Sequence, residues 1–158
     1  RTPMSATEMV ECGAALADLL GPGDVLILDG PLGAGKTTFT RGLGRGLGVR
    51  GPITSPTFVI ARVHPSLVGG PSLVHVDAYR VESLDDVDAL DLDASVEDSV
   101  TVVEWGLGRV EQLSESYLLI HLDRGDHTQD DERTIDWRVV GDGWQSRAAA
   151  LERVLGEQ

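Results

Sequence analysis

The sequence predicts an α/β fold in which a largely parallel sheet is flanked by helices and ends in a C-terminal antiparallel hairpin. Helix-like segments alternate with short, continuous apolar runs, as in parallel strands that are buried on both faces. Near the C-terminus, the polar stretch DRGDHTQDDER separates the runs YLLIHL and TIDWRVV, a pattern typical of a hairpin at a sheet edge. A chain of 158 residues suits one hydrophobic core, so we expect a single domain over residues 1–158.

The elements can be assigned in order along the chain. The first is a helix over residues 5–20, where Ser5 and Glu8 have the spacing of a capping box. The apolar run VLILD predicts a strand at 25–29, and a glycine-rich stretch separates it from a helix over 36–47. Three more strands, the two hairpin strands and a last helix are expected at residues 58–63, 73–77, 100–105, 117–122, 134–140 and 144–155.

The charge of the chain limits the partners that it can bind. The formal net charge is −13, whereas proteins that bind nucleic acid directly neutralise phosphates with clustered Lys and Arg. We therefore expect any role on RNA to go through a partner protein. Nine acidic residues lie between Asp77 and Asp98, in a segment with helix-like apolar spacing. This segment is either a solvated acidic helix face or a docking surface for a basic partner.

The apolar content does not indicate a membrane segment. Hydrophobic residues make up 41% of the chain. No apolar run approaches the roughly 20 residues that span a bilayer. We expect a cytoplasmic protein without a transmembrane helix or signal sequence. The single cysteine, Cys12, cannot form an internal disulfide and is interpreted as a packing residue.

The stretch GPLGAGKT at residues 30–37 fits the pattern G-x-x-x-x-G-K-[ST] and contains the only lysine of the chain, although arginine occurs twelve times. It lies between a predicted strand and a predicted helix, which is the arrangement of a phosphate-binding P-loop. In such a loop the glycines let backbone N–H groups turn toward the phosphates. The ammonium group of Lys36 would reach the β and γ phosphates, and the hydroxyl group of Thr37 would bind Mg²⁺. The alternative is a glycine-rich turn that only caps a helix. The residues expected to bind the nucleotide are Gly30, Gly33, Ala34, Gly35, Lys36, Thr37 and Thr38.

Two acidic residues at strand ends are candidates to complete this site. Asp77 ends the run LVHVD and Glu104 ends VTVVE, and from these positions a carboxylate can hold Mg²⁺ or polarise a water molecule. His75, within LVHVD, is interpreted as a structural histidine rather than a catalytic one. The absence of asparagine, and hence of an N-K-x-D motif, argues against a GTPase, and the absence of an L-S-G-G-Q-like segment argues against an ABC-type ATPase. A hydrolysing ATPase, a small-molecule kinase and a nucleotide-sensing binding module without turnover remain as alternatives.

Four motifs, taken in order, resemble those of the TsaE (YjeE) family, the P-loop ATPases of bacterial tRNA threonylcarbamoyladenosine biosynthesis. They are GPLGAGKTTFTRGL, SPTF at 55–58, HVDAYR at 75–80 and VEW at 103–105. The resemblance implies a P-loop NTPase-type domain with ATP and Mg²⁺ as cofactors. It also implies an accessory ATPase, weak alone, that acts with TsaD and TsaB. ATP hydrolysis would sustain threonylcarbamoyl transfer to the tRNA adenosine next to the anticodon, and tRNA would be reached only through the complex.

The resemblance assigns roles to five residues. Lys36 matches the phosphate lysine and Thr37 the magnesium threonine. Glu104 matches the glutamate associated with the metal, so Thr37 and Glu104 are the expected metal ligands. Asp77 matches the acid thought important for hydrolysis, and Thr57 resembles a switch threonine that senses the γ phosphate. Besides Lys36, the expected catalytic residues are therefore Asp77, Glu104 and Thr57.

Overall fold

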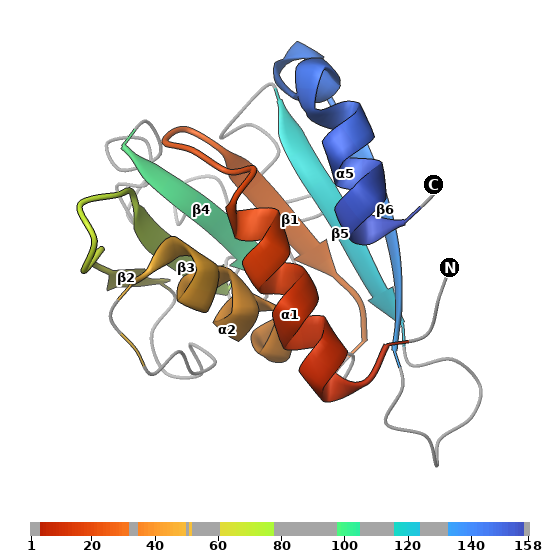
Figure 1. Cartoon of the computed structure of the whole chain (residues 1–158), viewed down its shortest axis with the longest axis horizontal. Coiled ribbons are helices and arrows are strands. Elements are labelled where there is room, and N and C mark those ends of the chain that lie inside the picture. Colours follow the sequence, from red (N-terminus) through yellow and green to blue (C-terminus); the bar gives the residue numbers. More distant parts are fainter. Residues whose placement is uncertain are drawn as a thin grey trace.

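The computed structural model describes residues 4–31, 35–49, 51, 61–77, 98–104, 116–123 and 133–156. These residues form a six-stranded sheet with helices packed against it (Figure 1). The strands are β1 (Val25–Asp29), β2 (Ala61–His64), β3 (Ser72–Asp77), β4 (Ser99–Glu104), β5 (Tyr117–Asp123) and β6 (Thr134–Val140). The helices are α1 (Ala6–Ala17), α2 (Lys36–Leu47), the 3₁₀ helix η3 (Asp142–Arg147) and α5 (Ala148–Leu155). The α/β class predicted from the sequence is confirmed.

The sheet is parallel in its centre and antiparallel at both edges. Its order is β2-β3-β4-β1-β5-β6, and β3, β4, β1 and β5 run parallel. The antiparallel pairing of β5 with β6 confirms the predicted hairpin. The antiparallel direction of β2 was not predicted, and it follows from chain length, because only residues 65–71 separate β2 from β3. A parallel connection needs a crossover of about a dozen residues or more. Of the strand expected at 58–63, residues 58–60 lie outside the described residues.

The helices α1, α2 and α5 lie on one face of the sheet (Figure 1). Their apolar side chains and alternate residues of the strands form one buried core, whose members include Met9, Leu16, Leu26, Leu28, Phe39, Leu43, Val100, Val102, Leu118 and Ile120. The intervening strand residues Val25, Ile27 and Val103 are buried as well. The central strands are thus removed from water on both faces, which explains their continuous apolar runs.

The ends of the first and last helices show how far local sequence signals reach. The Oγ of Ser5 accepts a hydrogen bond from the backbone N–H of Glu8, and the Ser5 N–H donates to Glu8 Oε1, both at 3.2 Å. The predicted capping box of α1 is therefore confirmed, although α1 ends at Ala17 and not at residue 20. The helix expected over 144–155 begins two residues earlier and consists of η3 followed by α5.

Glycines allow α1 and α2 to approach each other closely. A Cβ atom on Gly42 of α2 would collide with the carbonyl oxygen of Val10 in α1, and one on Gly13 of α1 would collide with the carbonyl oxygen of Phe39. Because the colliding atoms belong to the backbone, a side-chain rotation could not relieve the contact. The close packing holds α2 against α1 and the sheet, and α2 is the helix that follows the glycine-rich stretch.

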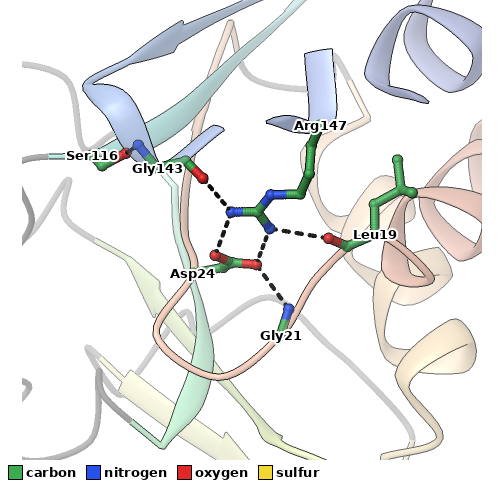
Figure 2. A network of polar contacts seen from close by, with 6 residues as sticks. All are labelled: Leu19, Gly21, Asp24, Ser116, Gly143 and Arg147. Atoms are coloured by element: carbon green, nitrogen blue, oxygen red, sulfur yellow. Dashed lines mark hydrogen bonds and ion pairs between the residues drawn. The ribbon is translucent and has the colours of Figure 1, made fainter. Parts of the chain in front are cut away.

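A polar network ties the C-terminal elements to the loop between α1 and β1 (Figure 2). Arg147 at the end of η3 forms a bidentate ion pair with Asp24, with Nη1 to Oδ2 at 2.5 Å and Nη2 to Oδ1 at 3.0 Å. The same guanidinium donates to the carbonyl oxygens of Leu19 and Gly143, at 3.0 and 2.9 Å. Asp24 Oδ2 also accepts from the N–H of Gly21 at 2.8 Å. Both carboxylate oxygens of Asp24 and both terminal nitrogens of Arg147 are therefore hydrogen-bonded.

Two further predictions concern Cys12 and membrane segments. Burial raises the pKa of the Cys12 thiol to about 11, and its Sγ donates to the carbonyl oxygen of Val154 at 3.5 Å. These contacts confirm Cys12 as a packing residue between α1 and α5. No helix among the described residues is long and apolar enough to cross a membrane.

Candidate nucleotide-binding site

The candidate site begins where β1 ends and α2 starts. Gly30 follows β1 with φ +146°, and a Cβ atom there would collide with the carbonyl oxygen of Leu122 in β5. Gly35 is the N-cap of α2 with φ +100°, a backbone conformation that favours glycine. The two glycines of the motif that the structure describes are therefore required by the backbone. Gly33 and Ala34, also predicted to bind the nucleotide, lie outside the described residues.

The N-terminus of α2 faces this loop without a capping side chain. No side-chain hydrogen bond caps α2 at Gly35. The first turn of a helix leaves backbone N–H groups without intrahelical partners and carries partial positive charge. Thr37 and Thr38 lie in this turn and are partly exposed. The arrangement suits an anion such as a phosphate group.

Lys36 is the first residue of α2, and its side chain folds back over the loop. The Nζ atom donates hydrogen bonds to the carbonyl oxygens of Gly30 at 2.7 Å and Pro31 at 3.0 Å. Only 6% of the residue is exposed. Phosphate oxygens are charged, so each would accept a stronger hydrogen bond from this ammonium group than a neutral carbonyl oxygen does.

The predicted acids end neighbouring strands on the same edge of the sheet. Glu104 pairs with Leu28 of β1 on one side and with Asp77 of β3 on the other. Adjacent strands lie about 4.8 Å apart, so the backbone of Asp77 is about 10 Å from β1, and that of Glu104 lies between them. The structure thus brings Lys36, Thr37 and Glu104 to one edge, with the backbone of Asp77 beside them. The side chain of Asp77 and the whole of Thr57 lie outside what the structure describes.

Glu104 is a buried carboxylate with one histidine partner. Its Oε2 lies 2.7 Å from Nε2 of His75, and the two side chains are 6% and 0% exposed. An ionised carboxylate can only accept, so the histidine tautomer that bonds to it is the one with its hydrogen on Nε2. The sequence did not predict this contact, since His75 and Glu104 are 29 residues apart and only the β3–β4 register brings them together. The one available signal was the alternation that places His75 and Asp77 on the same face of one strand.

A second polar pair borders the loop on the β5 side. His121 Nδ1 lies 2.9 Å from Oδ2 of Asp29, the last residue of β1. Both side chains are partly exposed, at 41% and 30%. The pair lies next to Gly30 in sequence and joins the end of β1 to β5, with which Asp29 is in register. No sequence motif had singled out this contact, which depends on the register of β1 and β5.

The residues at this edge of the sheet include oxygen donors that fit the Mg²⁺ of a bound nucleotide. Among the described residues, no group of three or more His, Cys, Asp or Glu side chains could hold a metal ion. Mg²⁺ keeps several water molecules and is commonly bound by one or two protein oxygens together with substrate phosphates. The hydroxyl of Thr37 and the carboxylate of Glu104 are hard oxygen donors of this kind, beside a helix N-terminus suited to phosphates.

Comparisons with known proteins give one consistent result. The family model of the threonylcarbamoyl adenosine biosynthesis protein TsaE matches residues 4–135. The tRNA threonylcarbamoyladenosine biosynthesis protein TsaE of Streptomyces coelicolor is 60% identical over 139 residues, which are 86% of this chain and 93% of that protein. The protein of the same name from Bacillus subtilis is 41% identical over 133 residues, 84% of this chain and 80% of the relative. The crystal structure of Bacillus subtilis YdiB superposes with a TM-score of 0.74 at 34% identity, covering 95% of this chain and 90% of YdiB.

Proposed function

This chain belongs to the TsaE family, whose members act in tRNA threonylcarbamoyladenosine biosynthesis, and we propose that it does so by binding and hydrolysing Mg·ATP. One observation carries the proposal: the fold gathers Lys36, the N-terminus of α2 and Glu104 at the carboxyl edge of the parallel strands. In open α/β sheets this edge is where ligands bind.

The residues of the chain divide the task between binding and activation. The N–H groups of the loop and of the first turn of α2 would bind the phosphates, and Lys36 would exchange its bonds to Gly30 and Pro31 for phosphate oxygens. Thr37 and Glu104 would hold Mg²⁺, which neutralises charge that develops on the β and γ oxygens. Asp77 would orient the attacking water, and Thr57 would sense the γ phosphate.

The protein would act on tRNA only as part of a complex. We propose TsaD and TsaB as its partners, with ATP hydrolysis sustaining their transfer of the threonylcarbamoyl group to the adenosine next to the anticodon. The net charge of −13 supports indirect contact with tRNA, because the chain lacks the excess of basic residues that a phosphate backbone requires. The acidic segment at 77–98 lies almost wholly outside the described residues and stays a candidate docking surface.

Reconstitution tests this function directly. The chain is mixed with TsaD, TsaB, tRNA and the threonylcarbamoyl donor, and both phosphate release and modified adenosine are measured with and without ATP. We expect phosphate release that depends on the partners, and sustained modification only when the chain and ATP are present. A phosphorylated small molecule beside ADP would indicate a kinase. Sustained modification without phosphate release would indicate a nucleotide-sensing module, and either result would overturn the proposal.

A further inference from the structure

The buried pair of His75 and Glu104 carries an inference that rests on the proposed function and adds a residue to it. Neither the P-loop motif nor the proposed division of tasks uses His75. Its side chain is fully buried, and its Nε2 lies 2.7 Å from Glu104 Oε2. We infer that His75 is a positioning residue, which donates a hydrogen bond to Glu104 and thereby orients this carboxylate toward Mg²⁺ of the bound nucleotide.

The sheet register explains why these two side chains meet. His75 of β3 pairs with Val102 of β4, and Asp77 pairs with Glu104. Residues two positions apart on a strand lie on the same face, so His75 and Glu104 are diagonal neighbours on adjacent strands. This face is the one that carries the buried residues Leu73 and Val102 beneath the helices. The pair is therefore placed by the rigid centre of the sheet and not by a loop.

The other ring nitrogen, Nδ1, supports a role of His75 toward Glu104. Among the described residues, Nδ1 of His75 is buried and has no hydrogen-bond partner. A leucine would fill this apolar position without a buried polar atom that lacks a partner, and a core position selected for packing alone would favour it. The polar contact that the structure gives His75 is the one to Glu104. The free-energy cost of burying Nδ1 without a partner is thus accounted for by the bond that orients the carboxylate of Glu104.

Orientation matters for a metal ligand because the last torsion of a glutamate has broad, two-fold preferences. A bond from His75 to Oε2 selects one arrangement, and in the described part of the chain the other oxygen, Oε1, has no hydrogen-bond partner. Oε1 is then available to Mg²⁺ or to a water molecule that Mg²⁺ holds. Residues that orient a ligand in this way commonly change metal affinity by about 10- to 100-fold when replaced.

Metal binding without turnover provides the test. Mn²⁺ is titrated into the protein saturated with the non-hydrolysable nucleotide AMP-PNP, and bound Mn²⁺ is measured by electron paramagnetic resonance. His75→Leu removes the donor at similar volume and should weaken Mn²⁺ binding by about 10- to 100-fold. His75→Gln carries an amide N–H at the same bond distance from Cα as Nε2 and should restore binding to within about threefold. AMP-PNP affinity in EDTA should stay unchanged in both variants.

Two further variants make the result decisive. His75→Asn is shorter, so its amide reaches only the depth of Nδ1, and it should bind Mn²⁺ as weakly as His75→Leu. Thr101→Val is the matched control. Like His75 Nδ1, Thr101 Oγ1 is buried without a hydrogen-bond partner among the described residues, and it lies on the neighbouring strand β4. It should leave Mn²⁺ affinity unchanged. If His75→Leu does not fold, the comparison of Gln with Asn decides.

The outcomes separate this inference from the proposed function. Equal Mn²⁺ affinity in the native protein and in the folded Leu and Asn variants would overturn the role of His75, while the proposed function would stand. Equal weakening by Gln and Asn would also overturn it, since the donor would then be irrelevant. If the native protein itself bound neither AMP-PNP nor Mn²⁺, the proposed function would fail first, and the inference with it.

Discussion

Lys36 carries the only side-chain amine of the chain, and it is almost buried beside the loop that it is expected to serve. An amine-reactive reagent should therefore label this one side chain slowly in the free protein. Mg·ATP should protect it further, because phosphate oxygens would then engage the ammonium group. Digestion and mass spectrometry would separate this label from the α-amino group. Equal labelling with and without nucleotide would contradict the proposed phosphate contact.

The two carboxylates at the strand ends allow a second prediction at the residue scale. Glu104→Gln should raise the Mg²⁺ concentration needed for half-maximal ATP turnover, because a metal ligand loses its charge. Asp77→Asn should leave nucleotide and Mg²⁺ affinity nearly intact and lower turnover by about 100-fold, the scale of a lost positioned base. Both changes are nearly isosteric, so both variants should fold.

The measurement is turnover with the partners present, titrated against Mg²⁺, together with the nucleotide affinity of each variant. If Asp77→Asn proved to be the Mg²⁺-sensitive variant, and Glu104→Gln bound normally without turning over, the two roles would be reversed. If neither variant changed turnover, the assignment of both acids to the site would be wrong.

At the scale of elements, the packing of α1 on α2 controls the position of the P-loop helix. Gly42→Ala would place a methyl group against the backbone of Val10, so the helices must separate. The strain should exceed the gain in helix propensity and lower the free energy of unfolding by about 1–3 kcal/mol. Gly21→Ala is the control, because a Cβ there meets nothing within 4 Å, and its change should stay within about 0.5 kcal/mol. Chemical denaturation measures both, and equal stability of the two variants would contradict the close contact.

The network of Asp24 and Arg147 lies at the start of β1, whereas the glycine-rich loop follows the end of this strand (Figure 2). Arg147→Ala should lower the free energy of unfolding by about 2 kcal/mol, because it leaves a largely buried carboxylate with fewer charge-assisted hydrogen bonds. It also removes the guanidinium stacked 3.9 Å from the centre of the Trp144 ring. Nucleotide affinity should not change. Arg153→Ala, which replaces an exposed arginine of α5, is the control for stability. A loss of nucleotide affinity in Arg147→Ala would show that the two ends of β1 are coupled.

The elements also show what the sequence could and could not predict. The capping box of α1, the run of β1 and the loop before α2 depend on residues within a few positions of one another, so local patterns predict them. The pairing of His75 with Glu104 and of Asp24 with Arg147 spans 29 and 123 residues, and it depends on strand register and on where η3 packs. The antiparallel direction of β2 follows from the short connection between β2 and β3. The length of this connection is known only once the start of β3 is assigned.

For the molecule as a whole, the topology explains why the candidate site lies where it does. β1 is an interior strand, with β4 on one side and β5 on the other, and all three run parallel. Their carboxyl ends therefore meet at one edge, where the chain leaves β1 as the loop that precedes α2. Glu104 lies beside the end of β1 on β4, and the pair of Asp29 and His121 joins that end of β1 to β5. Sequence motifs far apart in the chain converge because the parallel strands share a direction.

The charge of the whole molecule leads to the last prediction. With 26 acidic residues against 13 basic ones, the isolated protein should show no measurable affinity for tRNA at physiological salt. Affinity for a phosphate backbone comes from cations that release bound counterions, and here a net negative charge repels the same backbone. A filter-binding or gel-shift titration measures this, and the chain should be retained with tRNA only when TsaD and TsaB are added. Tight binding by the isolated chain that weakens steeply with salt would show direct contacts to phosphates, and the indirect route to tRNA would then be wrong.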